Sequence, residues 1–436
     1  MTSTRRSLLA GAAAAAGAFA LSGCAAPGRR RPVRDPAQPA RLMVIGVAGR
    51  GGDNLGAVAD QDLRVLCDVD ARHLAAAAKR FPGARLVRDF RDVLADPAAC
   101  RELDGVVVST PDHTHYPATM LALQQGLDVY CEKPLTHTVA QARRLRFAAE
   151  RHGNVTQMGT QIHANNNYRR VVEAVRAGAV GAVREVVVFV NGTDWSATSM
   201  PPAKAAPDFL DWELWLGPAA AMPYADGFHP AGWRRYWAFG GGTTADMSCH
   251  FTDLAFWALD LDNPTSLLAD GDEPHADCAP KGLRCESTFA ARGERPALTL
   301  RWHAGSDRPH AALAERGLAD WRNGVLFVGD DGWLIADYSR YVVGPDGRRA
   351  AFTPPPASIV ASPGHHREWL DCSARGTEPS CSFAYAVPLT EHVLLANAAF
   401  RGARGRRLPW HAAAMTTGDA AVDALLDEPV RAGYPV

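Results

Sequence analysis

Short apolar runs alternate with helix-like stretches between Arg41 and Gly159. In order, the runs read RLMVI, RVLCDV, DGVVVST, LDVYCE and NVTQMG. Strands that alternate with helices predict a parallel sheet whose faces are covered by the helices. We therefore expect an α/β fold that begins with a doubly wound parallel sheet over residues 41–160.

The pattern changes after Gly159, and a loop rich in Trp, Pro and Gly runs up to Gly242. Helices are expected over residues 166–177, 364–373 and 388–399, and strands over 184–191, 297–303, 325–328 and 333–337. This mixture predicts a C-terminal α+β domain over residues 161–415 with an open mixed or antiparallel sheet, followed by a tail over 416–436. Because such a sheet often packs against a copy of itself, we expect a homodimer or homotetramer.

The first 24 residues are typical of a processed export leader. Arg5 and Arg6 precede a weakly apolar, alanine-rich stretch, and twin arginines are typical of the route that exports folded proteins. The run from Leu21 to Cys24 resembles a lipobox, which predicts acylation of Cys24. The alternative is an uncut anchor, but spanning a bilayer takes roughly twenty apolar residues. We expect an exported lipoprotein, periplasmic or at the outer face of the cytoplasmic membrane, which touches the membrane only through its lipid and carries residues 25–40 as a linker.

The balance of positive and negative residues limits the kinds of partner that the protein can bind. Lys and Arg total 46 against 47 Asp and Glu, so the net charge is -1, and no basic tract is present. This excludes the basic surface of a nucleic-acid binder and favours a small, neutral substrate. No clustered His and Cys spacing indicates a metal site. Cys278 with Cys285, and Cys372 with Cys381, are close enough in sequence to form disulfides outside the cytoplasm.

A glycine-rich turn over residues 46–51 follows the first predicted strand and precedes a helix. Glycines there let the backbone approach a pyrophosphate, whose charge is met by the N-terminus of the helix. At the end of the next strand, the carboxylate of Asp68 is placed to bind the adenosine ribose and to repel a 2'-phosphate, which favours NAD over NADP. Ala48 departs from the pattern, because its methyl group stands where a second glycine is usual. The cofactor residues predicted from this motif are Gly46, Ala48, Gly49, Arg50, Gly51 and Asp68.

Two polar clusters follow later strands of the same sheet. One runs from Ser109 to His115, and the other is the triplet Glu132-Lys133-Pro134. Ligands of open parallel sheets bind beyond the carboxyl ends of the strands, where both clusters are expected. Lys133 is the first candidate for catalysis, and the alternative is a solvated lysine at a strand end. The predicted cofactor contacts are Ser109, Thr110, Pro111, His113, His115, Glu132, Lys133 and Gln161, and His163 and Tyr168 are expected beside the substrate.

The stretch from Gly241 to His250 predicts a second chemical site on a helix. Asp246 and His250 are four residues apart, so on a helix they share one face. A carboxylate beside an imidazole orients the ring and raises its basicity, which suits a general base. The alternative is a histidine flanked by acids in a structural helix. Trp233 and Arg234 precede this helix and suit the faces and hydroxyls of a sugar ring, although core packing is an equally ordinary use of tryptophan.

These motifs resemble those of the glucose-fructose oxidoreductase and inositol dehydrogenase family, Gfo/Idh/MocA, from about Arg41 to Trp410. The most specific are the Glu132-Lys133-Pro134 triplet and the glycine pair followed by Asp246 and His250. Within the family, the chain is similar to exported members of bacterial sugar-utilisation systems. The resemblance implies a sugar or cyclitol substrate, NAD or NADP as cofactor, and Lys133 with His250 as the catalytic pair.

Three classes of function stay open from the sequence. The first is an NAD(P)-dependent oxidoreductase that acts on a secondary alcohol, with carbon 3 of a pyranoside as the expected position. There His250 exchanges the hydroxyl proton, Lys133 polarises the carbonyl, and Asp246 orients His250 and binds ring hydroxyls. The second is a redox-neutral glycosidase or lyase that passes through a 3-keto intermediate, and the third is a non-catalytic sugar-binding lipoprotein. Because an exported enzyme meets no free nicotinamide pool, we expect its cofactor to be tightly bound.

Overall fold

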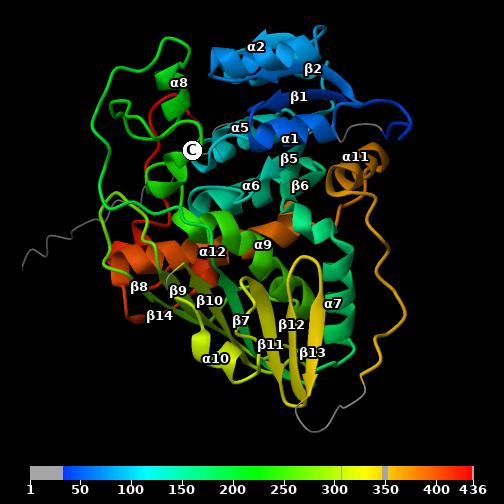
Figure 1. Cartoon of the computed structure of the whole chain (residues 1–436). Coiled ribbons are helices and arrows are strands. Elements are labelled where there is room, and N and C mark those ends of the chain that lie inside the picture. Colours follow the sequence, from blue (N-terminus) through cyan, green and yellow to red (C-terminus); the bar gives the residue numbers. More distant parts are fainter. Residues whose placement is uncertain (1–32, 306, 346–351, 435–436) are drawn as a thin grey trace, which may run out of the picture.

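The computed structural model describes residues 33–305, 307–345 and 352–434 (Figure 1). The predicted leader, with Arg5, Arg6 and Cys24, lies outside the described residues. Within the described ranges, no helix combines the length and the apolar character that a bilayer crossing requires.

The N-terminal domain is built on a six-stranded parallel sheet with the order β3-β2-β1-β4-β5-β6. Its central strands β1, β4 and β5 are buried except for the first residue of β1 and of β5, which explains why they read as continuous apolar runs. The strands are β1 (Arg41–Ile45), β2 (Asp62–Cys67), β3 (Arg85–Val87), β4 (Gly105–Val108), β5 (Asp128–Glu132) and β6 (Thr156–Gly159). The helices are α1 (Arg50–Ala57), α2 (Ala71–Arg80), α3 (Arg91–Leu94), α4 (Pro97–Cys100), α5 (Asp112–Gln124) and α6 (Val139–His152). This is the doubly wound sheet predicted from the sequence.

The C-terminal domain holds an eight-stranded mixed sheet with the order β13-β12-β11-β7-β10-β9-β8-β14. Only the central pair β7 and β10 runs parallel, and β9 and β10 alternate buried with more exposed residues, as strands with one covered face do. The strands are β7 (Val183–Val190), β8 (Ser266–Gly271), β9 (Leu283–Phe289), β10 (Leu298–Ala304), β11 (Gly324–Gly329), β12 (Gly332–Ala336), β13 (Tyr341–Pro345) and β14 (Arg407–Pro409). The expected mixed sheet is confirmed.

Two helices, α9 (Gly242–Leu259) and α12 (Phe383–Ala403), lie between the two sheets, and α7 (Asn166–Arg176) packs on α9 and runs along the side of the mixed sheet (Figure 1). They pack on one face of the mixed sheet, and α12 also packs on α6 and β6 of the N-terminal domain. The start of α9 therefore lies beside the carboxyl ends of the strands of the parallel sheet. The remaining helices are α8 (Trp212–Leu216), α10 (His310–Ala314), α11 (His365–Arg375) and α13 (Ala420–Asp423), with short 3-10 turns η1 (Gln161–Ala164), η2 (Gly232–Arg235) and η3 (Ala412–Ala414).

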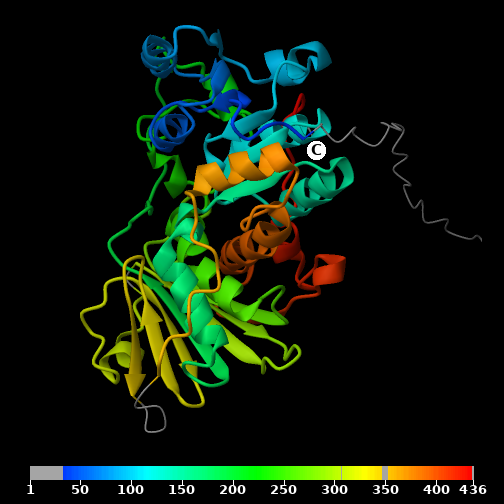
Figure 2. The ribbon, with the colours of Figure 1, turned by 90° about the vertical axis from the view of Figure 1, so that its right-hand side faces the viewer.

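Several features differ from the sequence prediction. α12 is 21 residues long, well beyond the expected 388–399, because Pro388 lies within its first turns and does not end it. α11 lies late in the chain yet packs on β5 and β6 of the N-terminal sheet (Figure 2). Neither of the two cysteine pairs that lie close in sequence forms a disulfide: Cys278, Cys285, Cys372 and Cys381 are free thiols.

Candidate functional site

A cavity of about 790 Å³ lies between the carboxyl ends of the parallel strands and the start of α9. It falls within the size range of small-molecule and cofactor sites. Most of the residues that the sequence predicts for the site line it. These are Gly46, Ala48, Gly49, Arg50, Asp68, Ser109, Thr110, Pro111, His115, Glu132, Lys133, Gln161, Trp233, Arg234, Asp246 and His250.

The glycine turn before α1 has no room for side chains at two of its positions. A Cβ atom on Gly46, which has a φ of +81°, would lie 2.6 Å from the carbonyl oxygen of Ser109. A Cβ atom on Gly51 would lie 2.1 Å from the carbonyl oxygen of Gly46. Gly49 has a φ of +54°, and a Cβ atom there would meet nothing within 4 Å. Gly46 and Gly51 therefore serve the close packing of turn, strand and helix, while Gly49 leaves open space beside the cavity.

The two groups expected to hold a dinucleotide are in place at this turn. The N-terminus of α1 has no side-chain cap, and Gly49 and Arg50 line the cavity there. The carboxylate of Asp68 is fixed by the backbone N–H groups of Val47, at 3.0 Å, and Asp70, at 2.9 Å. A pyrophosphate fits the uncapped helix end, and a ribose fits the oriented carboxylate. The residues present thus fit the predicted nucleotide, and the negative charge of Asp68 disfavours the 2'-phosphate of NADP.

Lys133 and Asp246 form a shielded ion pair at the other end of the cavity. The Lys133 Nζ donates to Oδ1 of Asp246 at 2.7 Å and to its backbone oxygen at 2.6 Å. The Asp246 carboxylate also accepts from Nε1 of Trp195 at 2.8 Å and from Nε of Arg234 at 3.2 Å. Burial alone would raise the pKa of Asp246, but the charges of Lys133 and Arg234 outweigh it and hold the pKa well below its usual value. Lys133 is therefore no solvated lysine at a strand end.

His250 lines the same cavity one helical turn after Asp246. Burial lowers the pKa of His250 to about 3, and the charge of Lys133 acts in the same direction. Its Nδ1 is buried without a hydrogen-bond partner among the described residues. The hydrogen bonds to the Asp246 carboxylate come from Lys133, Trp195 and Arg234, and none comes from His250. The charge of Asp246 raises the pKa of His250, although burial outweighs it, and orientation of the ring by Asp246 stays a prediction. The ring enters the site as a neutral imidazole.

Four residues predicted to contact ligands lie outside the cavity lining. One is Gly51, which packs against the backbone oxygen of Gly46. His113 is buried, and its ring contacts the backbone oxygens of Phe239 and Trp215. His163 is fully buried beside Asp253, with both carboxylate oxygens 3.0 Å from its Nδ1. Tyr168 is fully buried and donates to the backbone oxygen of His250 at 3.2 Å. These three side chains lie behind the cavity wall, because each is on the buried face of its helix or turn.

His115 reaches the cavity wall, but its ring nitrogens are already used. They lie 2.8 Å from the backbone oxygens of Pro134 and Thr110. Burial lowers the pKa of His115 to about 4, so the ring is neutral and only one of these contacts is a donated hydrogen bond. The side chain ties α5 to the Glu132-Lys133-Pro134 triplet and contributes no free polar group to a cofactor.

A buried amide and acid network behind the cavity was missed by the sequence analysis. Glu132 accepts from Nδ2 of Asn54 at 2.9 Å and from Nε2 of Gln161 at 2.6 Å. The Oδ1 of Asn54 contacts Nε2 of His366 at 2.9 Å, and the His366 ring stacks on Tyr130 with centroids 4.5 Å apart. The sequence signal for Asn54 was a polar residue in a glycine-rich helix, and the structure buries it fully. The contact with His366 had no signal in the sequence, because 312 residues separate His366 from Asn54.

Asp112 is a second residue whose importance the sequence did not reveal. It begins α5, is 6% exposed and lines the cavity. Burial raises its pKa to about 7, against the opposing charges of Arg234 and Lys133. The carboxyl group therefore titrates near neutral pH beside the ion pair.

Two family models match the chain. Residues 40–160 match an oxidoreductase family with an NAD-binding Rossmann fold, and residues 164–294 match the C-terminal alpha/beta domain of the same family. Together they cover more than half of the chain. The N-terminal domain is thus an NAD-binding Rossmann domain, as predicted.

Individual proteins are similar over shorter stretches. The chain is 29% identical over 148 residues to an inositol 2-dehydrogenase of Rhodococcus jostii (strain RHA1), a match that covers 33% of this chain and 39% of that protein. It is 33% identical over 124 residues to a D-apiose dehydrogenase of Paraburkholderia graminis, covering 28% of this chain and 31% of that protein. The chain therefore spans less than half the length of these relatives.

The fold recurs in the solved structure of the WlbA dehydrogenase from Bordetella pertussis in complex with NADH and UDP-GlcNAcA. That likeness has a TM-score of 0.61 at 19% identity and covers 87% of this chain and 99% of that one. At this identity, the likeness establishes the shared two-domain fold.

Proposed function

Because the chain belongs to the Gfo/Idh/MocA oxidoreductase family, we propose that it is an NAD-dependent dehydrogenase acting on a secondary alcohol of a sugar, glycoside or cyclitol. The two relatives named above are an inositol and an apiose dehydrogenase, which supports a polyhydroxylated substrate. Carbon 3 of a pyranoside is our proposed position of oxidation.

One observation carries this proposal. Lys133 from the end of β5 and His250 from α9 face the same cavity as the glycine turn and Asp68. A protein that only binds sugar has no use for an amine and a neutral imidazole placed together beside a dinucleotide site. The arrangement supports hydride transfer coupled to proton transfer.

The side chains divide the proton chemistry between them. A bound nicotinamide supplies the hydride acceptor. His250 is neutral, and its Nδ1 is sealed within protein, so Nε2 is the atom that takes the hydroxyl proton. The Lys133 ammonium, held by Asp246, stabilises the negative charge that develops on the substrate oxygen. Negative charge on that oxygen also favours protonation of His250, which offsets its low pKa.

We further propose that the cofactor stays bound through catalysis in an exported protein. Segments remote in sequence enclose the cavity beside Asp68, including Trp215 of α8 and Tyr434 of the C-terminal tail. The tail is fixed by Arg431, which pairs with Glu213 at 2.7 Å and donates to Gly217 at 3.0 Å. Such walls slow the escape of a nucleotide, which an enzyme outside the cytoplasm requires. Export of the folded protein by the twin-arginine route accounts for loading before secretion, and acylation of Cys24 would anchor the exported protein to the membrane.

The open part of the mixed sheet supports self-association. α7, α9 and α12 cover one face, and Leu313, Leu318 and Trp321 cover the other face over β7, β11 and β12. Over β9 and β10 that second face carries half-exposed charged residues such as Glu286 and Arg301. We propose a homodimer or homotetramer through this face, which light scattering of the purified protein measures directly.

The test of the proposed function is a single-turnover assay on the purified protein. Its bound cofactor is quantified after denaturation, and sugars, glycosides and cyclitols are then added one at a time while absorbance of the reduced nicotinamide is followed. Products are identified by mass spectrometry. We expect a ketosugar with stoichiometric cofactor reduction, and Lys133→Met should lower the rate by about 100-fold or more. Lys79→Met, on the exposed face of α2, is the matched control and should not change it.

The same assay separates the alternatives. Release of an aglycone with unchanged steady-state cofactor absorbance would indicate the redox-neutral glycosidase or lyase. Ligand binding with no product from any compound, in protein that carries its cofactor, would identify a sugar-binding protein and refute the dehydrogenase.

A further inference from the structure

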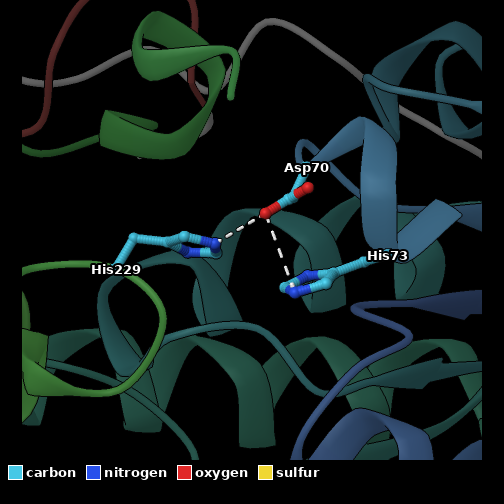
Figure 3. Close-up of side chains that lie close together, drawn as sticks. All are labelled: Asp70, His73 and His229. Atoms are coloured by element: carbon cyan, nitrogen blue, oxygen red, sulfur yellow. Dashed lines mark hydrogen bonds and ion pairs between the residues drawn. The ribbon is translucent and has the colours of Figure 1, made fainter. Parts of the chain in front are cut away.

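A second cluster of ionisable side chains lies apart from the Lys133 and Asp246 pair. Asp70 caps the N-terminus of α2, His73 lies one turn further along that helix, and His229 comes from the loop between α8 and η2. Figure 3 shows the two imidazole rings approaching one carboxylate oxygen of Asp70 from different elements. The cluster joins the N-terminal domain to a loop whose His229 lies 159 residues after Asp70 in the chain.

The three side chains already have the spacing of metal ligands. His229 Nε2 lies 2.9 Å and His73 Nε2 lies 3.7 Å from Oδ2 of Asp70. All three ligand atoms lie within 4.8 Å of one another. Ligands bound at about 2.0 to 2.1 Å in a tetrahedral zinc site are separated by about 3.4 Å. Small side-chain rotations therefore suffice to bring the three atoms around one ion.

The cluster is shielded from solvent yet open to the cavity. The Asp70 side chain is 0% exposed, that of His229 is 10% exposed and that of His73 is 24% exposed. His73 and His229 line the cavity, and Asp70 lies behind them. An ion entering from the cavity would meet the two imidazoles first and the carboxylate beneath them. This leaves coordination positions that face the cavity for water or a hydroxyl oxygen.

The backbone around the cluster is held in place before any ion binds. The segment that leads into α8 docks on the start of α2, where Ala71 donates to the backbone oxygen of Phe209 at 2.9 Å and Asp211 donates to that of Val69 at 3.1 Å. Oδ1 of Asp70 accepts from the backbone N–H of Arg72 at 2.8 Å. Outer contacts of this kind orient ligands in metal sites, so little ordering is left for the ion to impose.

We propose that Asp70, His73 and His229 bind one divalent transition-metal ion of the zinc class. Two imidazole nitrogens and one carboxylate oxygen suit zinc, cobalt or nickel, whereas magnesium and calcium prefer an all-oxygen shell. The ion would fasten the α8 loop to α2 beside Asp68, whose Oδ1 lies 3.7 Å from Nδ1 of His73. Its ligands are distinct from the proposed catalytic pair Lys133 and His250.

Arg72 is the competitor for the same carboxylate. Its Nη2 lies 2.8 Å from Oδ2 of Asp70, and its Nε lies 3.2 Å from Oδ1. The Arg72 side chain is 56% exposed and lies over the ring of Phe209. A metal ion must displace the Nη2 contact and tolerate the nearby positive charge. Removing Arg72 should therefore tighten metal binding, whereas a cluster that only forms ion pairs would gain no affinity for metal.

The experiment is metal binding to tag-free, full-length protein with its cofactor in place. The protein is stripped with a chelator and titrated with Zn²⁺ by calorimetry and with Co²⁺ by visible absorption, whose intensity reports a tetrahedral site. We expect one equivalent per chain, and His73→Ala and His229→Ala should each weaken binding by about tenfold or more. Arg72→Met should tighten it, and His310→Ala, an exposed histidine of α10, is the matched control that should leave it unchanged.

Each outcome decides the proposal. Absence of a stoichiometric Co²⁺ spectrum in the wild type and in Arg72→Met would overturn it, as would binding that survives both histidine substitutions. If those two variants fail to fold, Arg72→Met alone decides, since unchanged or weaker binding in that variant contradicts the competition. Lys133→Met should bind metal as the wild type does, so failure of the dehydrogenase proposal leaves this result interpretable.

Discussion

Replacing Asp246 by asparagine tests whether the buried ion pair positions Lys133. Asparagine has the same shape but no charge, and its amide nitrogen cannot accept the hydrogen bonds that Lys133, Trp195 and Arg234 donate to the two carboxylate oxygens. Lys133 and Arg234 would then face each other without the anion between them. The contact from Lys133 to the backbone oxygen of residue 246 would remain.

The expected cost follows from burial. The side chains of Lys133 and Asp246 are 9% and 14% exposed, and removing one partner of a buried pair costs about 3 to 5 kcal/mol of unfolding free energy. At roughly 2 °C per kcal/mol for a large domain, Tm should fall by about 6 to 10 °C. A displacement of Lys133 of about 1 Å would lower the rate of hydride transfer by about 100-fold.

A solvent-exposed ion pair in the same chain provides the matched control. Lys204 and Asp226 form an ion pair of the same chemistry, but their side chains are 55% and 63% exposed. Asp226→Asn should cost far less stability than Asp246→Asn and leave turnover unchanged, because solvent screens an exposed pair. Tm is measured by calorimetry, and hydride transfer by single-turnover absorbance of the bound cofactor.

Two results would refute this reasoning. If Asp246→Asn lost no more stability than Asp226→Asn, burial would not govern the strength of the pair. If Asp246→Asn folded, kept its cofactor and transferred hydride within twofold of the wild-type rate, Asp246 would not position Lys133.

Three further predictions concern the cofactor turn and pH. Gly51→Ala should abolish cofactor retention, measured as nucleotide content, because the new Cβ would lie 2.1 Å from the Gly46 oxygen. Gly56→Ala in the same helix is the control, since its Cβ would meet nothing closer than 3.9 Å. This variant should retain the nucleotide and gain about 0.5 to 1 kcal/mol of unfolding free energy. In plots of kcat/KM against pH, a limb with an apparent pKa of about 7 should be present in the wild type and absent in Asp112→Asn; a limb unchanged in the variant would rule Asp112 out. Buried His250, whose pKa falls to about 3, contributes stability above pH 6.5 that is lost as pH falls toward 3, and His113 and His365, whose pKa values also fall to about 3, act alike. Tm should therefore fall steadily below pH 6.5, and a flat profile would contradict this.

The sequence predicted the parallel sheet well because its strands are buried on both faces. β1 coincides with the run RLMVI at Arg41–Ile45, and the other main strands of that sheet lie within the predicted runs or at most two residues outside them. The mixed sheet was harder, since β9 alternates polar with apolar residues, β14 has only three residues, and β8 and β13 each hold a short apolar run beside polar or glycine residues. Such segments carry too little apolar signal to stand out from loops.

The sequence predicted only those parts of the candidate site whose residues lie close to one another in the chain. The glycine turn, the strand-end Lys133 and the Asp246-His250 helix each carry their signal within a few residues, and all reach the cavity. The partner of Asp246 could not be read from the four-residue spacing, because the competing lysine comes from another domain. For the same reason, His163 was expected at the substrate although it pairs with Asp253 on the buried side of α9.

The charge balance around Asp246 links these observations to chemistry. Lys133 and Arg234 bring two positive charges to one carboxylate, so the group carries a net positive charge as long as Asp112 is protonated. A developing alkoxide meets that excess charge in a shielded cavity, where electrostatic stabilisation is strongest. Ionisation of Asp112 cancels the excess, which is why its pKa of about 7 should set the alkaline limit of activity. No single motif encodes this balance, because its four members come from α5, β5, η2 and α9 and meet only in the folded chain.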